Sequence, residues 1–306
     1  MTMTTRSVQL AKSKTSTFTL AAFATFALMA CASQPETKAE TKAADPAEAK
    51  SSDPNNCISP KDCLNKGALA NKNQDYVKAA KFLEPACEIE AKACNIAGEI
   101  YRNGSGVPKD GAKAAMLHQK GCEKGLIISC AIEAQLRYAG IDGVAVDKGR
   151  ARLAFEKSCS PEFLDSCTNA GVMYAGGEGG DPDKEKARIL YQKACDGGDQ
   201  TGCVNAAAMY LNGEGGPADK PKAHAMFDAA CEKKNALGCY NAGLVYAKGL
   251  DGAVDLEKGT ALLQKACEGN NKKGCEVAQQ IRDDQAKQAA AQQAAAAKGA
   301  KKQAKK

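Results

Sequence analysis

The chain has 306 residues with no Trp, 7 Phe, 8 Tyr, 29 Gly and 15 Cys. One layered core built from such small side chains would bury little apolar area, so the composition favours a repeat fold stabilised locally. The formal net charge of +6 lies at the ends, with +3 in residues 1–30 and +4 in residues 283–306, which leaves −1 for residues 31–282. A nearly neutral body has no electrostatic footprint for a phosphate backbone, so we expect no nucleic acid partner.

Residues 1–30 have the features of a secretory signal peptide. Three basic residues precede a short apolar run at 18–29, which is too short and too rich in Ala and Thr to span a bilayer. The run ends in Leu-Met-Ala-Cys at Cys31, which resembles the lipobox of bacterial lipoproteins, whose Cys is acylated. An ordinary signal peptide with a chance Cys is the alternative. Cys31 is the one cysteine outside the pairs described below, so lipidation is favoured, and we expect a periplasmic or outer-membrane lipoprotein.

Two further segments lack a pattern that could pack. Residues 31–56 are rich in Ala, Glu, Lys, Thr and Pro, which predicts a flexible tether. Residues 283–306 are rich in Ala, Gln and Lys, with helix propensity but no apolar stripe. The favoured interpretation is a solvated, fraying extension of the last helix. The alternative is electrostatic contact with anionic lipid or a cell-wall polymer.

Fourteen cysteines fall into neighbouring pairs, which recur every 35 to 37 residues from Cys87 onward. A secretory signal and an even, regular set of cysteines predict disulfides within each pair. A structural zinc site would need Cys-x-x-Cys-like spacing or nearby His, and neither is present. The predicted bridges are Cys57–Cys63, Cys87–Cys94, Cys122–Cys130, Cys159–Cys167, Cys195–Cys203, Cys231–Cys239 and Cys267–Cys275.

Alignment on these pairs predicts two helices per repeat. Twelve residues before the first Cys of six pairs stands an Asp, which suits a helix N-cap. A Lys or Arg follows three residues later, and then a small residue against which another helix must press. Seven residues after the second Cys stands a recurrent Tyr, and three residues further a Gly that suits the helix end. We therefore expect six two-helix units within residues 57–282 and a terminal helix from Cys275. The columns are Asp75, Asp110, Asp147, Asp183, Asp219 and Asp255; Ala79, Ala114, Ala151, Ala187, Ala223 and Gly259; Tyr101, Tyr174, Tyr210 and Tyr246; and Gly104, Gly140, Gly177, Gly213 and Gly249.

The combination of Gly171 and Tyr174 with Ala187 and Tyr191 resembles a tetratricopeptide relative, but the period of about 36 residues is longer. With Asp-x-x-Lys-Ala before each second helix, the pattern is similar to the Sel1-like repeat, and one Cys pair per unit resembles the Helicobacter cysteine-rich proteins. The resemblance covers residues 57–282. It implies an all-α fold, a right-handed α/α superhelical solenoid stapled by disulfides. It also implies an activity to be weighed, since some members bind or slowly hydrolyse β-lactams.

The residues themselves do not favour an enzyme. No Ser has Lys three residues later, and neither Ser-Asp-Asn nor Lys-Thr-Gly occurs, as an acylating serine β-lactamase would require. His118 shares a column with Leu, Phe and Tyr, which predicts core packing, and His224 shares a column with Ala, Arg and Thr, which predicts a tolerant surface. We therefore expect no catalytic residue, metal or cofactor. The alternative is a weak β-lactam or peptidoglycan-fragment hydrolase, which rests on the family resemblance alone.

The leading hypothesis is a lipid-anchored, extracytoplasmic scaffold that binds proteins or extended peptides. Asn169, Asn205 and Asn241 share one position on three successive first helices, and their amides could grip the main chain of a peptide on a concave face. Alternatively, they brace the helix start near the disulfide. Tyr174, Tyr210 and Tyr246 could flank the same groove, but packing between units is favoured for them.

Overall fold

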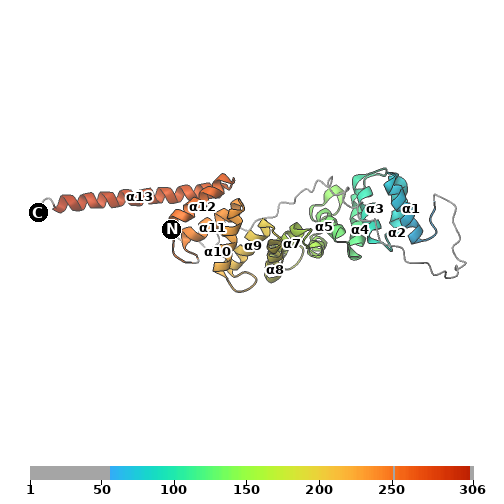
Figure 1. Cartoon of the computed structure of the whole chain (residues 1–306), viewed down its shortest axis with the longest axis horizontal. Coiled ribbons are helices and arrows are strands. Elements are labelled where there is room, and N and C mark those ends of the chain that lie inside the picture. The colour runs from blue at the N-terminus through green and yellow to red at the C-terminus, as the bar shows by residue number, and fades with distance from the viewer. Residues whose placement is uncertain (1–55, 251, 304–306) are drawn as a thin grey trace, which may run out of the picture. The chain divides into compact units, whose positions relative to one another are not determined.

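The computed structural model describes residues 56–250 and 252–303. The predicted signal peptide, Cys31 and nearly all of the predicted tether lie outside the described residues. Within those residues there are thirteen α-helices, one 3-10 helix and no strand, which follow the predicted order of two helices per repeat and one terminal helix (Figure 1). The all-α class and the repeat architecture are confirmed. The right-handed superhelix stays a prediction.

The helix bounds follow the cysteine pairs closely, apart from the terminal helix, which is much longer than the others. In chain order the helices are α1 (Pro60–Lys72), α2 (Tyr76–Ala86), α3 (Ala91–Asn103), α4 (Gly111–Glu123), α5 (Ile127–Ala139), η4 (Ile141–Gly143), α6 (Lys148–Ser158), α7 (Leu164–Gly176), α8 (Lys184–Asp196), α9 (Gln200–Asn212), α10 (Lys220–Glu232), α11 (Ala236–Lys248), α12 (Leu256–Glu268) and α13 (Lys272–Gln303).

The helices belong to two compact units, one with α1 to α5 and η4, the other with α6 to α13. Each unit has its own core of small and medium side chains. In the first unit Leu83 and Ala97 are fully buried, and in the second Phe227 and Leu263 are fully buried. The division falls after Val146, within the third predicted repeat, where the sequence alone indicated one uninterrupted array.

The Asp column starts every second helix, as the sequence predicts. Each of the six side chains accepts a hydrogen bond from the backbone N–H three residues later, as Asp183 does from Lys186 at 2.9 Å. The Gly column ends the first helices in the left-handed region, with Gly177 at φ 70°. Such a φ is costly for residues that carry a Cβ, so the column needs Gly.

The small-residue column allows close helix packing within each repeat. Ala79, Ala114, Ala151, Ala187 and Ala223 have no exposed surface. The first helix contributes its own small residue, because a Cβ on Gly171 would lie 2.6 Å from the ring of Tyr191. The helices therefore approach without bulky side chains between them, which is how a chain poor in large apolar residues can build a core.

All seven predicted disulfides are present in the described residues. Six of them join the end of a second helix to the next first helix, as Cys195 at the end of α8 and Cys203 in α9 do. Each of these six bridges spans seven or eight residues of sequence. The disulfides therefore tie together the helices of consecutive repeats.

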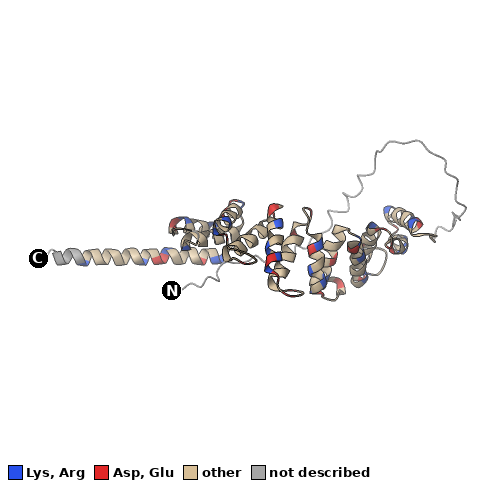
Figure 2. Ribbon diagram, turned by 90° about the horizontal axis from the view of Figure 1, so that it is seen from below, with Lys and Arg blue, Asp and Glu red and all other residues tan. Residues whose placement is uncertain are grey.

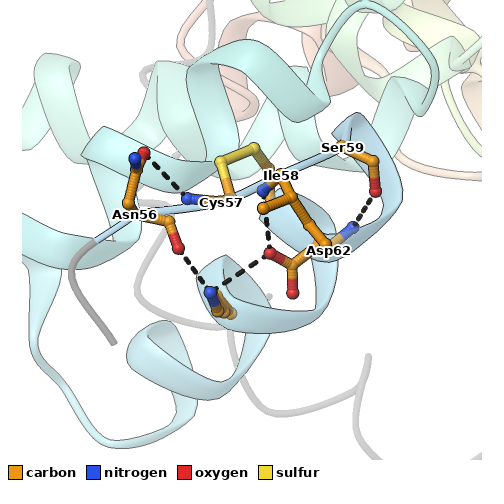
Figure 3. A network of polar contacts seen from close by, with 7 residues as sticks. Asn56, Cys57, Ile58, Ser59 and Asp62 are labelled. Carbon is orange, nitrogen blue, oxygen red and sulfur yellow. Dashed lines mark hydrogen bonds and ion pairs between the residues drawn. A yellow bond between two sulfur atoms is a disulfide. The ribbon is translucent and has the colours of Figure 1, made fainter. Parts of the chain in front are cut away.

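The bridge between Cys57 and Cys63 differs, because it closes the start of the array onto α1 (Figure 3). Ser59 caps the helix by accepting from the N–H of Asp62 at 3.2 Å, and Asp62 accepts from the N–H of Ile58 at 3.1 Å. Lys66 contacts the Asp62 carboxylate at 3.1 Å. The Ile58 N–H and the Lys66 ammonium lower the pKa of Asp62. The first repeat thus begins with an ordered polar network.

The third repeat has a loop that the sequence columns did not predict. The 3-10 turn η4 follows Gly140, and Asp142 adopts φ 58°. The carbonyl oxygen of Asp142 would lie 2.3 Å from a Cβ on Gly111, and its carboxylate contacts Lys109 at 2.5 Å. Close backbone approach therefore requires Gly111 at the start of α4.

The helix α13 runs without interruption across the predicted boundary at residue 283, and extends beyond α12 as a straight helix (Figure 1). Its side chains from residue 282 to 298 are all exposed. Charged residues of both signs occur on the described helices, while much of α13 carries neither (Figure 2). The interpretation of residues 283–306 as a solvated extension of the last helix stays a prediction. Contact with lipid or polymer stays a prediction.

Candidate binding site

The four tyrosines of one column occupy the last turn of α3, α7, α9 and α11. In each case the backbone N–H of the next N-cap Asp donates to the tyrosine carbonyl oxygen, at 3.0 Å for Asp110 and 2.9 Å for the others. The same Asp starts the following helix, so the backbone fixes the position of the ring relative to that helix. The pairs are Tyr101 with Asp110, Tyr174 with Asp183, Tyr210 with Asp219 and Tyr246 with Asp255.

Because of this connection, the Lys three residues after each Asp lies over the tyrosine ring. The ammonium nitrogen is 3.9 to 4.6 Å from the ring centroid in all four repeats. Arg152 and Arg188, on α6 and α8, add a guanidinium at 4.6 and 4.9 Å from the rings of Tyr174 and Tyr210. Each tyrosine therefore bears at least one cation, an attraction that the ring quadrupole favours. We call the four sets of residues the Tyr–Lys clusters: Tyr101–Lys113, Tyr174–Lys186, Tyr210–Lys222 and Tyr246–Lys258.

In three clusters the preceding second helix supplies a carboxylate. The hydroxyl of Tyr246 donates to Asp228 at 2.9 Å, that of Tyr174 donates to Glu156, and that of Tyr101 donates to Glu84. The Lys186 ammonium also contacts Glu156, at 2.6 Å. Each of these acids stands three residues before the first Cys of a cysteine pair, and the sequence alone did not indicate a role for this column. The signal was present, since each acid precedes its tyrosine by 17 or 18 residues.

The carboxylate affects the titration of its neighbours. Burial, followed by the hydrogen bond to Glu156, raises the pKa of the Tyr174 phenol. The contact with Glu156 also raises the pKa of the Lys186 ammonium. The phenol of Tyr174 and the ammonium of Lys186 therefore keep their protons at neutral pH, beside the side chain of Glu156.

The Tyr210–Lys222 cluster lacks this carboxylate. Gln192 stands in the acid column, and its Nε2 donates to Asp196 on the same helix at 2.7 Å. Within the part of the chain that the structure describes, its Oε1 is buried without a hydrogen-bond partner. Lys222 and Arg188 both face the Tyr210 ring, at 4.0 and 4.9 Å. This cluster therefore has two positive charges and no acid.

A wider pattern marks Gln192 as an exception. In the third and seventh first helices the tyrosine is replaced by Arg137 and Arg282, and their guanidinium groups donate to Gln119 and Gln264 at 2.8 and 3.4 Å. Tyr is thus paired with an acid in three repeats, and Arg with Gln in two. Gln192 with Tyr210 is the sixth combination, and here the described residues contain no corresponding hydrogen bond.

The structure places the predicted asparagines differently from the tyrosines. Asn205 and Asn241 have no exposed surface, and Asn169 is half-buried. A fully buried amide presents nothing to an extended peptide, so this burial favours the bracing interpretation over the peptide grip. Tyr174 is also buried, and its contact with Glu156 favours packing between repeats, while Tyr210 and Tyr246 stay half-buried at the surface.

The two histidines pack against neighbouring helices. His118 is fully buried, as the sequence predicts, and packs against Gly98. The prediction of a tolerant surface for His224 is wrong. Its side chain is 14% exposed, its ring packs edge-on against Tyr246 at 4.2 Å between centroids, and its Nε2 lies 3.6 Å from Asp228. Among residues 56–250 and 252–303 we find no group of three His, Cys, Asp or Glu side chains arranged to hold a metal ion.

The architecture defines a helical repeat protein in which a Tyr or Arg of the first helix recurs at one position and, in five of the described repeats, donates to the preceding second helix. The Sel1 repeat profile matches residues 62–89, 91–126, 164–199, 201–235 and 236–271, more than half of the chain. The chain belongs to the Sel1 repeat family, whose members generally act as protein-interaction scaffolds. The unmatched stretch between residues 126 and 164 contains the unexpected η4 turn and the Arg137 substitution.

Two solved structures support the fold. The first is c5321, a protective antigen present in uropathogenic Escherichia coli strains, with 25% identity and a TM-score of 0.55 over 70% of this chain and 47% of that chain. The second is a Sel1 repeat protein from Oxalobacter formigenes, with 20% identity and a TM-score of 0.56 over 70% of this chain and 88% of that one. The chain spans about half the length of c5321. No curated protein shows significant similarity to it.

Two observations concern the surroundings of the protein. Seven disulfides are typical of an oxidising, extracytoplasmic environment. Among the helices that the structure describes, none combines the length and the apolar character that a membrane span needs.

Proposed function

We propose that the protein is an extracytoplasmic scaffold that binds proteins or peptides through the Tyr–Lys clusters of its second unit. The observation that carries this proposal is the succession of Lys186, Lys222 and Lys258 over half-buried or buried tyrosines on consecutive repeats. Tyr and Arg are enriched at protein interfaces, and side chains that are already fixed in place lose little conformational entropy on binding.

The cellular location of the protein forms part of the same proposal. Residues 1–30 would direct export, Cys31 would carry the lipid, and residues 31–56 would tether the repeats to the inner or outer membrane. One cysteine pair per repeat supports assignment to the Helicobacter cysteine-rich type. Residues 283–306 would extend from the repeats, where their lysines could contact anionic lipid or polymer.

Crosslinking in intact cells followed by affinity purification tests the proposal. The test variant combines Lys186→Gln, Lys222→Gln and Lys258→Gln. The matched control combines Lys220→Gln, Lys233→Gln and Lys265→Gln, which removes the same charge from exposed lysines outside the clusters. We expect the test variant to lose captured proteins that the control retains. Equal capture by both variants would contradict the proposal.

The alternative function, binding or slow hydrolysis of β-lactams or peptidoglycan fragments, rests on the resemblance to the cysteine-rich proteins. Turnover of a chromogenic β-lactam by the oxidised protein, above background and lost on reduction, would reverse the ranking. We expect no turnover, because the clusters offer cations and phenols but no Ser-x-x-Lys nucleophile.

A further inference from the structure

We propose that Tyr210, Lys222 and Arg188 form a binding site for a carboxylate of a peptide partner. This inference rests on the scaffold function proposed above and names the chemistry that one of its clusters recognises. The site lies at the surface, where Lys222 is exposed and the other two side chains are half-buried.

The neighbouring repeats show how a carboxylate fits this constellation. In the Tyr174–Lys186 cluster, one oxygen of Glu156 accepts from the phenol and the other contacts the ammonium at 2.6 Å. In the Tyr246–Lys258 cluster, Asp228 accepts from the phenol at 2.9 Å. Three clusters thus contain an internal carboxylate that accepts from the phenol, and in two of them this carboxylate, of Glu84 or Glu156, also contacts the lysine. The fourth keeps the phenol and the lysine but replaces the acid by Gln192.

The charge of this cluster is uncompensated. Arg188 and Lys222 lie within 5 Å of the same ring centroid, and among the described residues neither forms an ion pair with an acid. Both other tyrosine clusters of this unit carry an acid at the equivalent position, Glu156 or Asp228. Two adjacent cations without a counter-charge attract an anion. A carboxylate supplies the negative charge and can also accept a hydrogen bond from the phenol.

The arginine is held in place before any ligand arrives. Arg188 donates from Nη1 to the carbonyl of Pro217 at 3.1 Å, in the loop after α9. Gly216 leaves the room for it, because a Cβ there would lie 1.7 Å from Nη2 of Arg188. The same arrangement holds Arg152 against Gly180 and the Asp181 carbonyl in the preceding repeat. A preorganised cation loses little freedom when it binds.

Gln192 leaves the acid position uncharged, since an amide accepts and donates hydrogen bonds but supplies no counter-charge for Lys222 or Arg188. Its Oε1 is buried at the place where other repeats have an acid that accepts from tyrosine. A ligand carboxylate would occupy the outer side of this position and accept from the Tyr210 hydroxyl and the Lys222 ammonium. The carboxylate can belong to an Asp or Glu side chain or to the C-terminus of the peptide.

Nuclear magnetic resonance of the full oxidised chain can test the site with three tripeptide probes. The first is N-acetyl-Ala-Ala-Ala with a free carboxylate, the second is N-acetyl-Ala-Glu-Ala amide, and the third is N-acetyl-Ala-Gln-Ala amide. We expect the Arg188 Nε–H signal to shift with one or both acidic probes and not with the neutral one. A response to the first alone assigns the C-terminal carboxylate, and a response to the second alone assigns the acidic side chain.

Two variants make the test specific. Gln192→Glu supplies the missing internal carboxylate, so we expect it to abolish the shift, while Lys222→Gln should weaken binding by about ten-fold or more. Conversely, Glu156→Gln removes the internal carboxylate from the Tyr174–Lys186 cluster. In this variant we expect the Arg152 Nε–H signal to shift when an acidic probe is added. Glu is native at the equivalent positions 84 and 156, which supports correct folding of Gln192→Glu.

No response to either acidic probe, or an unchanged response in Gln192→Glu, would overturn the inference. The scaffold proposal fails separately, when the combined lysine variant captures the same proteins as its matched control. If capture of a partner requires Lys186 and Lys258 but is unchanged in the Gln192→Glu variant, the scaffold proposal stands and the proposed carboxylate site is wrong.

Discussion

At the scale of single residues, Asp183 and its five counterparts each start a helix, and four of the six also determine a second feature. The side chain starts a helix, and the backbone N–H of the four that follow a tyrosine binds the tyrosine carbonyl. A residue chosen for helix capping thereby also fixes the distance between Lys and ring. The side-chain cap accounts for the Asp in all six repeats, because the backbone N–H that binds the tyrosine carbonyl would be present on any residue except Pro.

Replacement of Asp183 by Ala should lower the free energy of unfolding of its repeat by about 1 kcal/mol, because the Lys186 N–H loses its acceptor. Thermal unfolding followed by circular dichroism measures the change. Asp181→Ala is the control, since the structure uses only the backbone carbonyl of that residue, which accepts from Arg152. Equal destabilisation by both substitutions would contradict the capping role.

Several tyrosines should ionise only at high pH in the native protein. Burial, with a nearby Glu as a second cause, raises the pKa of Tyr101, Tyr174 and Tyr191. Because the pKa of each phenol is higher in the native than in the unfolded protein, its contribution to the free energy of unfolding is complete below the unfolded-state pKa of about 10. This contribution is lost as the pH rises through the native-state pKa. Ultraviolet titration should show a class of phenols that ionises later in the native than in the denatured protein. Coincident curves would disprove the burial of these hydroxyls.

The residue scale also shows what the sequence could not establish. The Asn column is regular, but a column in a repeat alignment says only that the positions are equivalent, not whether they face solvent. Asn205 and Asn241 turned out to be fully buried. To recognise the relation between Gln192 and Tyr210 from the sequence, one would have to pair positions 18 residues apart in different repeats. The five equivalent hydrogen bonds in the structure reveal this pairing.

At the scale of helices, the ends were the most predictable features. Asp N-caps, Gly ends and cysteine pairs impose strict backbone or covalent requirements, so each leaves an unambiguous mark in the sequence. The η4 turn was not predictable in this way. It depends on the close approach of Asp142 to Gly111, and nothing in the spacing of either residue indicates that contact.

The helix ends can be tested with two glycines that differ in conformation. Gly213 ends α9 at φ 68°, and Gly213→Ala should destabilise its repeat by about 1 kcal/mol because a Cβ disfavours that φ. Gly176 is an exposed residue of α7, and a Cβ added there would meet no neighbouring atom within 4 Å, so Gly176→Ala should leave stability unchanged or slightly raised. Differential scanning calorimetry compares them, and the reverse order of stabilities would contradict the assigned helix end.

Removal of one inter-repeat bridge, by Cys195→Ala with Cys203→Ala, should cost about 2–3 kcal/mol for the short loop that it closes. Hydrogen exchange should show the loss mainly in α8 and α9, since stability in repeat proteins is local. The variant with Cys57→Ala and Cys63→Ala is the comparison, and its effect should be confined to α1. A uniform loss of protection throughout both compact units, from either variant, would contradict the local account.

At the scale of the whole molecule, seven bridges and several alanine columns compensate for the small number of large apolar side chains. Each compact unit buries its own core, and five of the described repeats contribute a hydrogen bond to the next through a tyrosine or an arginine. Stability and the proposed binding surface therefore arise from the same contacts. Lys222, whose cluster contributes no carboxylate bond, is the position where that surface is open to a partner.

Peptide mapping of the unreduced mature protein by mass spectrometry is the most direct test of this account. We expect seven linkages, each between neighbouring cysteines from Cys57–Cys63 to Cys267–Cys275, and no free thiol among these fourteen residues. Free thiols throughout, or linkages between cysteines of distant repeats, would contradict the account, because the helix ends would then lack the covalent joints on which the repeat packing and the extracytoplasmic assignment both depend.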